Sequence, residues 1–262
     1  MHFAVLTIFP KMFDLFWDHG IVRRAIAAGH VQPETLDIRA FTEDRHHVTD
    51  DRPYGGGCGM VMKPEPLARA ITAARERIEG AVTVLMSPQG DKLSQQTAEG
   101  LARQRGLIFI CGRYEGVDAR LFRRHVDYEL SIGDYVLSGG ELAAMVAMDA
   151  VIRLLPGVLG GAESAACDSF SDGLLEHGHY TRPREFEGRA VPEVLLSGDH
   201  QAIARWRQRM SLGETLLRRP DLLERRALNA RERLLLQEWH QTLERIFRHQ
   251  SAHRPDSLSG RE

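Results

Sequence analysis

Three turns that contain glycine or proline each follow an apolar, strand-like run. They lie in AVTVLMSPQG (81–90), LIFICGRYEG (107–116) and SIGDYVLSGGE (131–141). Open α/β sheets bind small ligands beyond the carboxyl ends of their strands, where such turns expose backbone N–H and C=O groups. Alternating donors and acceptors suit the edge of an adenine and a ribose, so the three turns predict one cofactor pocket. Three ordinary turns between strands and helices are the alternative interpretation.

None of these turns carries GxGxxG or GxxxxGK[ST], so neither a dinucleotide nor a triphosphate is favoured as the ligand. A further glycine-rich stretch, DDRPYGGGCGM (50–60), lies between two ordered stretches. Glycine lets backbone approach a ligand closely. This stretch is either a loop that becomes ordered over the substrate or a plain surface loop.

Several residues that follow the third turn along the chain have side chains suited to catalysis or metal binding. Arg153 ends the helix that follows this turn, where an arginine often only complements the helix dipole. Asp168 lies in CDSFSDG, where an aspartate is usually a turn or cap residue. His177 and His179 lack a third metal ligand, and Cys167 has no base beside it. Spacing alone therefore selects no catalytic residue and no metal site.

The first half of the chain alternates between strand-like and helix-like patterns. The predicted strands are 3–9, 31–41, 81–86, 107–111 and 126–130, and the predicted helices are 11–28, 64–78, 94–104, 117–124 and 139–154. This alternation predicts an α/β fold with a mostly parallel sheet and helices on its faces.

The pattern ends at Pro156 and Gly157, and the stretch that follows is rich in small and polar residues. Helical runs reappear near 200–211, 214–218 and 230–249. The domain prediction has four parts: a cofactor-binding α/β domain (1–160), an interdomain linker (161–175), a small helical domain (176–250) and a disordered tail (251–262).

Composition sets the class of protein. The chain has 262 residues, of which 43% are hydrophobic, and no apolar run is long enough to span a membrane. The start, MHFAVLTIFP, is expected to be a first strand rather than a signal peptide. Three widely spaced cysteines, Cys58, Cys111 and Cys167, argue against a disulfide framework and a cysteine-based zinc site. A reduced cytoplasm is the expected location.

Charge is unevenly distributed along the chain. The net charge is −2, yet residues 182–262 contain 16 arginines, no lysine and 12 acidic residues. A basic C-terminal third indicates a polyanionic partner, with a solvated helical face as the alternative. Trp206, between Arg205 and Arg207, either stacks on a nucleic-acid base or anchors its helix.

Taken together, the motifs resemble the bacterial tRNA (guanine-N1)-methyltransferases, the TrmD family in the SPOUT class of knotted methyltransferases. The resemblance rests on YGGGCGMVM, SPQG, CGRYEG, SIGDYVLSGGE, LLPGVLG, DSFSDGLLE and HYTRP, in this order and at family-like spacing. It covers nearly the whole chain. Cys58 is a departure, because the family usually has proline there.

The resemblance implies a SPOUT-type parallel sheet with a deep C-terminal trefoil knot, a small helical C-terminal domain and a homodimer. It implies S-adenosylmethionine as cofactor and guanosine 37 of tRNA, next to the anticodon, as substrate. Mg²⁺ is expected to assist, although no protein site for it is readable from the sequence. The implied cofactor-binding residues are Ser87, Pro88, Gly112, Tyr114, Glu115, Ile132, Gly133, Tyr135, Leu137, Gly139 and Gly140.

The acceptor presents the chemical difficulty in this reaction. N1 of guanine carries a proton, so a base must remove it, and charge that moves onto O6 must be stabilised. By correspondence with the family, Asp168 is the base and Arg153 the electrostatic stabiliser. The family pattern also brings Asp168 from the partner subunit, so the active site is expected at the dimer interface.

Two rival functions remain. One is a different SPOUT methyltransferase, which acts on a ribose 2′-oxygen or on ribosomal RNA. The other is a non-catalytic RNA-binding protein with a vestigial pocket.

Overall fold

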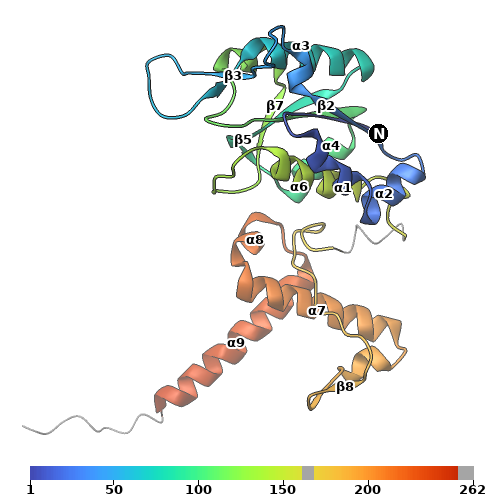
Figure 1. Cartoon of the computed structure of the whole chain (residues 1–262). Coiled ribbons are helices and arrows are strands. Elements are labelled where there is room, and N and C mark those ends of the chain that lie inside the picture. The colour runs from blue at the N-terminus through green and yellow to red at the C-terminus, as the bar shows by residue number, and fades with distance from the viewer. Residues whose placement is uncertain (161–167, 253–262) are drawn as a thin grey trace, which may run out of the picture. The chain divides into compact units, whose positions relative to one another are not determined.

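The computed structural model describes residues 1–160 and 168–252 (Figure 1). The chain separates into two compact units, Met1–Ala166 and Cys167–Glu262. Residues 161–167 of the predicted linker lie outside the described residues, as does the predicted tail from residue 253 onward.

A five-stranded parallel sheet forms the centre of the first unit. The strands are arranged in the order β2-β1-β6-β5-β7, and every neighbouring pair is parallel. Their bounds are β1 His2–Thr7, β2 Gln32–Asp37, β5 Val82–Lys92, β6 Gly106–Cys111 and β7 Tyr128–Ser131. The predicted α/β class and parallel sheet are confirmed. All six residues of β6 are buried, as expected for a strand that helices cover on both faces.

Helices pack on both faces of this sheet (Figure 1). One face contacts α3 (Pro64–Arg77), and its core contains Ile108 and Ile110. The opposite face contains Phe109 and packs against α2 (Gly20–Ala27), α4 (Gln95–Ala102) and α6 (Glu141–Ile152). Because successive residues of a strand point to opposite faces, β6 alone contributes to both cores.

The predicted helix 11–28 and the predicted strand 31–41 are partly wrong. The first is interrupted, because Gly20 has a left-handed φ of +63°, and it divides into η1 (Pro10–Phe13), α1 (Asp14–Trp17) and α2. The second ends at Asp37, whose carboxylate accepts a hydrogen bond from the Arg39 amide at 2.9 Å and starts η2 (Ile38–Phe41). A side-chain cap here ends one element and begins the next.

Short elements complete the first unit. They are β3 (Asp50–Asp51), β4 (Val61–Met62), η3 (Ala119–Leu121) and α5 (Phe122–His125).

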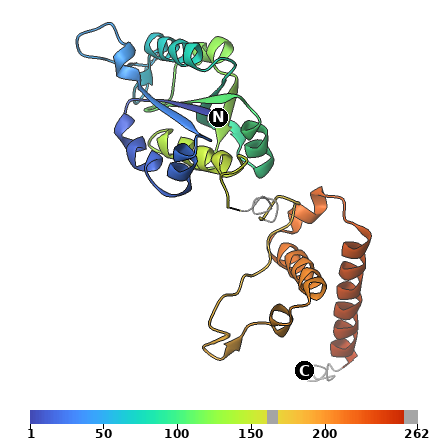
Figure 2. The ribbon, with the colours of Figure 1, turned by 90° about the vertical axis from the view of Figure 1, so that its right-hand side faces the viewer.

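Within residues 168–252, the second unit contains three α-helices, a 3-10 helix and a short hairpin (Figure 2). Its elements are β8 (Glu185–Phe186), β9 (Arg189–Ala190), η5 (Glu193–Leu196), α7 (His200–Arg218), α8 (Pro220–Arg225) and α9 (Ala230–Ala252). The two predicted helices 200–211 and 214–218 form one helix, because Gly213 stays helical beside the ring of Trp239, 3.6 Å from where its Cβ would lie.

Ile108 tests the position of β6 at the centre of the sheet. Its side chain is fully buried, so Ile108→Ala is expected to lower the free energy of unfolding by about 2–5 kcal/mol. Val48→Ala, at a side chain that is 41% exposed, should cost less than about 1 kcal/mol. Urea denaturation measures both variants, and a similar small loss in each would contradict this placement.

Candidate functional site

A pocket of about 470 Å³ lies where β5, β6 and β7 end. Each of the three predicted turns contributes to its lining, which contains glycines together with apolar and polar residues. All eleven residues that the resemblance implied for the cofactor line this pocket: Ser87, Pro88, Gly112, Tyr114, Glu115, Ile132, Gly133, Tyr135, Leu137, Gly139 and Gly140. Their roles stay predictions, but the structure brings them together.

The first wall of the pocket is a bulge within β5. Met86 and Asp91 both align with Leu130 of β7, so the four residues between them project out of the sheet. Gly90 lies against the backbone of β7 at Glu129 and Leu130 and leaves no room for a Cβ. The predicted strand 81–86 therefore continues beyond its turn, because the bulge rejoins the ladder.

The second wall is the turn after β6. Tyr114 has φ of +60° and Gly116 has φ of +113°. A tyrosine in the left-handed region is a local strain that surrounding contacts must maintain. The Glu115 amide donates to the Met60 carbonyl at 2.9 Å, and the Met62 amide donates to the Gly116 carbonyl at 2.9 Å. The turn is thus held against the end of the glycine-rich loop.

The glycine-rich loop connects β3 to β4, in which Asp50 aligns with Met62. Four of its glycines have positive φ: Gly55, Gly56, Gly57 and Gly59. Gly59 approaches the Glu115 side chain so closely that a Cβ would overlap it. The loop therefore ends at the pocket wall, in keeping with the interpretation of a loop over the substrate.

The third wall runs from Ile132 to Gly140. Gly133 has φ of +151°, and the Tyr135 hydroxyl donates to the Ile132 carbonyl at 3.2 Å. The Gly140 amide donates to the Gly112 carbonyl at 2.9 Å. The second and third walls are therefore joined through backbone as well as by side chains.

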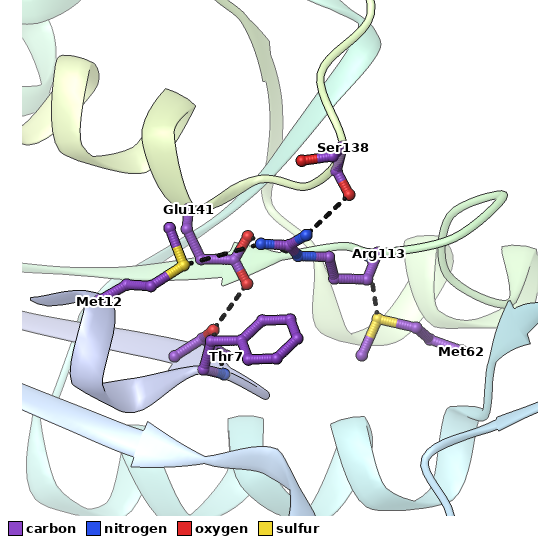
Figure 3. A network of polar contacts seen from close by, with 7 residues as sticks. Thr7, Met12, Met62, Arg113, Ser138 and Glu141 are labelled. Carbon is purple, nitrogen blue, oxygen red and sulfur yellow. Dashed lines mark hydrogen bonds and ion pairs between the residues drawn. The ribbon is translucent and has the colours of Figure 1, made fainter.

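A polar network beside the pocket was not predicted from the sequence, and its member Arg113 also lines the pocket. The Arg113 Nε donates to Glu141 Oε2 at 2.9 Å, and the Thr7 hydroxyl donates to Glu141 Oε1 at 2.8 Å (Figure 3). Thr7 and Glu141 are both fully buried. A glutamate that directly follows two glycines and begins the apolar helix ELAAMVAMDAVI was the available signal, since a buried carboxylate must have partners.

Cys111 lies beside this network at the end of β6. Burial raises the pKa of the Cys111 thiol well above its ordinary value, and the carboxylate of Glu141 raises it further. The thiol stays protonated at neutral pH and is unsuited to act as a nucleophile.

The two predicted catalytic residues occur in different units. Arg153 is the C-cap residue of α6, and its amide donates to the Asp149 carbonyl at 3.2 Å. Asp168 lies in the second unit, where its carbonyl accepts from the Ser171 amide at 3.2 Å. Neither residue is among those that line the pocket.

The segment after Asp168 is anchored to α7. The Leu175 amide donates to Thr215 Oγ1 at 2.9 Å, and the Glu176 amide donates to Ser169 Oγ at 3.0 Å. Thr215 is fully buried, and so almost entirely is Leu174. Segment 168–176 therefore follows the position of α7.

The two histidines of HGHY contact aromatic and acidic neighbours. His179 Nε2 lies 2.8 Å from Glu176 Oε1, and the ring centroids of His177 and Trp206 are 6.0 Å apart. Tyr180 also packs against Trp206, with centroids 6.1 Å apart. Trp206 therefore anchors this segment to α7.

Within residues 1–160 and 168–252, no group of three His, Cys, Asp or Glu side chains is arranged to hold a metal ion. Nor does any helix there combine the length and apolar character needed to cross a membrane.

Comparison with known proteins agrees with this architecture. The family model described as tRNA (Guanine-1)-methyltransferase TrmD matches residues 1–225. A tRNA (guanine-N(1)-)-methyltransferase of Desulfatibacillum aliphaticivorans is 56% identical over 259 residues, which cover 99% of each chain. Proteins with the same name are 55% identical in Pseudomonas putida strain GB-1, over 90% of this chain and 94% of the relative, and 53% identical in Nitrosococcus oceani, over 97% and 99%.

A parallel sheet whose strand ends enclose a glycine-lined pocket defines the class of α/β proteins with a pocket at the carboxyl edge of the sheet. The family model covers residues 1–225, and the first of these relatives is 56% identical over 99% of each chain, which identifies the family. The chain belongs to the tRNA (guanine-1)-methyltransferase family TrmD, and the predicted resemblance and enzyme class are confirmed.

Gly140 tests the contact between the second and third walls. A Cβ at this position would lie 2.8 Å from Cys111 Cα and 3.1 Å from the Gly112 nitrogen. Because both are backbone atoms, Gly140→Ala must displace a wall and is expected to cost about 1–3 kcal/mol of stability.

Gly100→Ala serves as the matched control, since Gly100 lies within α4 with open space around it. Alanine there should be neutral or stabilising by up to about 1 kcal/mol. Thermal unfolding compares the two variants. Equal melting temperatures would contradict the close contact at Gly140.

Proposed function

We propose that the pocket binds S-adenosylmethionine and that the chain transfers its methyl group to N1 of guanosine 37 of tRNA, next to the anticodon. One observation carries the proposal: the eleven residues implied for the cofactor, which come from three separate strand ends, line a single pocket. When bound, the cofactor would supply a methyl group attached to a sulfonium sulfur. After the transfer, that sulfur leaves as a neutral thioether. The pocket volume lies within the range of about 300–1,000 Å³ usual for ligands of this size.

The pocket fits such a cofactor in its chemistry. Gly112, Gly139 and Gly140 present backbone without side chains, and the Cβ that Gly140 lacks would meet the end of β6. Backbone N–H and C=O groups recognise an adenine edge, while Leu130 and Ala143 offer apolar surface in the same lining. We propose that these groups bind the adenosine portion.

Asp168 and Arg153 are proposed to act on the guanine. The carboxylate of Asp168 would accept the N1 proton, which makes the ring nitrogen nucleophilic. The guanidinium of Arg153 would stabilise the negative charge that develops on O6. Asp168 and Arg153 would thus activate the guanine that accepts the methyl group. The methyl donor would bind separately, in the pocket that neither residue lines.

A homodimer with its active site at the subunit interface accounts for the exposed apolar residues of the first unit. Leu142 and Val146 lie one turn apart on α6 and are 53% and 48% exposed. Phe9 and Met12 add further exposed apolar surface. We propose that a second copy covers them and contributes its Asp168 beside the pocket of the first, and that the chain around the pocket forms the trefoil knot typical of the family.

We propose that the second unit binds tRNA. Residues 176–250 were predicted to form this domain, and residues 161–175 to link it to the catalytic domain. Five exposed arginines lie between residues 182 and 207: Arg182, Arg184, Arg189, Arg205 and Arg207. None of the five forms an ion pair within the described parts of the chain. Unpaired arginines suit phosphate contacts, which supply most of the affinity for nucleic acid. No step is assigned to Mg²⁺, for which the described residues offer no cluster of three ligands.

Methyl incorporation into two tRNA transcripts tests the function. One transcript has guanosine at position 37 preceded by guanosine, and the other has adenosine at position 37. Label from S-adenosylmethionine is expected in the first alone and should map to guanine N1. Label in both transcripts would favour a different SPOUT methyltransferase, and label in neither would refute the proposed substrate.

Mixing two inactive variants tests the shared active site. Arg153→Ala and Asp168→Asn are each expected to lose at least ~10²-fold in turnover, the lower end of the contributions of an electrostatic stabiliser and of a general base. If the two residues come from different subunits, a mixed dimer contains one intact site and one doubly altered site. Random reassociation of equal amounts should then restore about a quarter of the wild-type activity.

The control is each variant reassociated with itself, which should remain inactive. Binding of S-adenosylmethionine, measured by calorimetry, should be retained in both variants. Absence of restored activity in dimers shown to be mixed would mean that the residues act within one subunit or not at all.

A further inference from the structure

Arg113, Glu141 and Thr7 join three elements beside the pocket, which Arg113 itself helps to line (Figure 3). Thr7 is the last residue of β1, Arg113 follows β6, and Glu141 is the first residue of α6. Each Glu141 oxygen accepts one hydrogen bond, from Arg113 Nε at 2.9 Å and from the Thr7 hydroxyl at 2.8 Å. The Thr7 oxygen in turn accepts from the Phe9 amide at 2.9 Å. The network is therefore continuous from β1 to α6.

Arg113 also holds the third wall of the pocket. Its Nη1 donates to the Ser138 carbonyl at 3.1 Å, and its backbone pairs antiparallel with Gly139. The side chain crosses Gly139 so closely that a Cβ there would overlap Nε. One residue thus fixes segment 138–139 through both its backbone and its side chain.

Burial makes this ion pair sensitive to the loss of either partner. The Glu141 side chain is 1% exposed and that of Arg113 is 17% exposed, and the Phe9 ring centroid lies 4.6 Å from the guanidinium carbon. Because Glu141 is buried, removing Arg113 leaves an uncompensated charge on its carboxylate. A lysine has no planar set of donors that can reach Glu141 and Ser138 together.

We propose that Arg113, Glu141 and Thr7 are positioning residues that fix the third wall and thereby set the affinity of the pocket for its cofactor. The inference rests on the proposed function, since it takes S-adenosylmethionine as the ligand. The network holds Gly139 and Gly140 in their bound arrangement before the ligand arrives. Preorganisation of this kind raises affinity, because less order is lost on binding. None of the three belongs to the implied cofactor set.

Arg113→Lys is the first test. The Kd for S-adenosylmethionine, measured by calorimetric titration of the full chain, is expected to rise about tenfold or more, since a charged hydrogen bond and its geometry are lost. Turnover at saturating cofactor should fall by a smaller factor. Arg69→Lys is the matched control, because Arg69 also donates to a carbonyl (Phe41, 2.8 Å) and a carboxylate (Glu43, 2.6 Å) but does not line this pocket. Its Kd should equal that of the wild type.

Thr7 supplies a second pair of variants that keeps the volume change small. Thr7→Val leaves Glu141 Oε1 without its donor and is expected to weaken cofactor binding. Thr7→Ser retains the hydroxyl and should bind close to the wild-type level. An equal Kd for both variants would overturn the role of the hydroxyl.

The titration separates positioning from partial unfolding. If Arg113→Lys only unfolded part of the sample, the number of binding sites would fall while the Kd of the folded molecules stayed unchanged, and the inference would be overturned. A wild-type Kd in Arg113→Lys at full stoichiometry would overturn it as well. If the wild type itself failed to bind S-adenosylmethionine, the proposed cofactor would be wrong and this inference with it, so the two failures are distinguishable.

Discussion

The close approach of the third wall to the end of β6 is the constraint on which the pocket depends. The Gly140 amide reaches the Gly112 carbonyl at 2.9 Å, and a Cβ on Gly140 would lie 2.8 Å from Cys111 Cα. Only a residue without a side chain permits this distance, so the requirement is steric rather than conformational. Because no side chain covers the backbone at Gly112 or Gly140, the turn after β6 and the third wall both present backbone N–H and C=O groups to the pocket. A pocket lined by backbone is a direct consequence of this contact.

A wall made of glycines has few side-chain contacts of its own. The ion pair between Arg113 and Glu141 provides such a contact, because Arg113 also donates to the Ser138 carbonyl. Burying Glu141 would be unfavourable alone, since an ionised carboxylate loses its hydration. Its two oxygens are instead paired with Arg113 and Thr7. A buried pair of this kind contributes modestly to stability but specifies one arrangement over others. Here the pair and Thr7 join the end of β1, the turn after β6 and the start of α6. The packing of β1 beside β6 therefore helps to set the shape of the pocket.

The sequence predicted the parallel sheet and the convergence of three turns, because both follow from local patterns. Apolar runs that end in glycine or proline identify strand ends, and parallel strands end at the same edge. What it did not predict depends on distant contacts. The continuation of β5 after its bulge requires β7 as a partner, and the partners of Glu141 lie 28 and 134 residues away. The break in the predicted helix 11–28 was readable in principle at Gly20, yet a single glycine inside a periodic pattern is often tolerated. Eleven pocket residues came from family resemblance, and the structure explains their proximity rather than their roles.

The division of the chain into two units has a consequence for catalysis of the kind proposed. The pocket belongs to the first unit, whereas Asp168 lies at the start of the second. Segment 168–176 is attached to α7 through Thr215, and Tyr180, which follows it, packs on Trp206 of the same helix. A movement of α7 would therefore carry the proposed base with it, since segment 168–176 is hydrogen-bonded to this helix at Thr215. If the second unit binds tRNA, its contact with the tRNA would also determine the position of the Asp168 carboxylate. Substrate binding and proton removal would then be linked through the rigid attachment of one loop to one helix, with no change needed in the cofactor pocket itself.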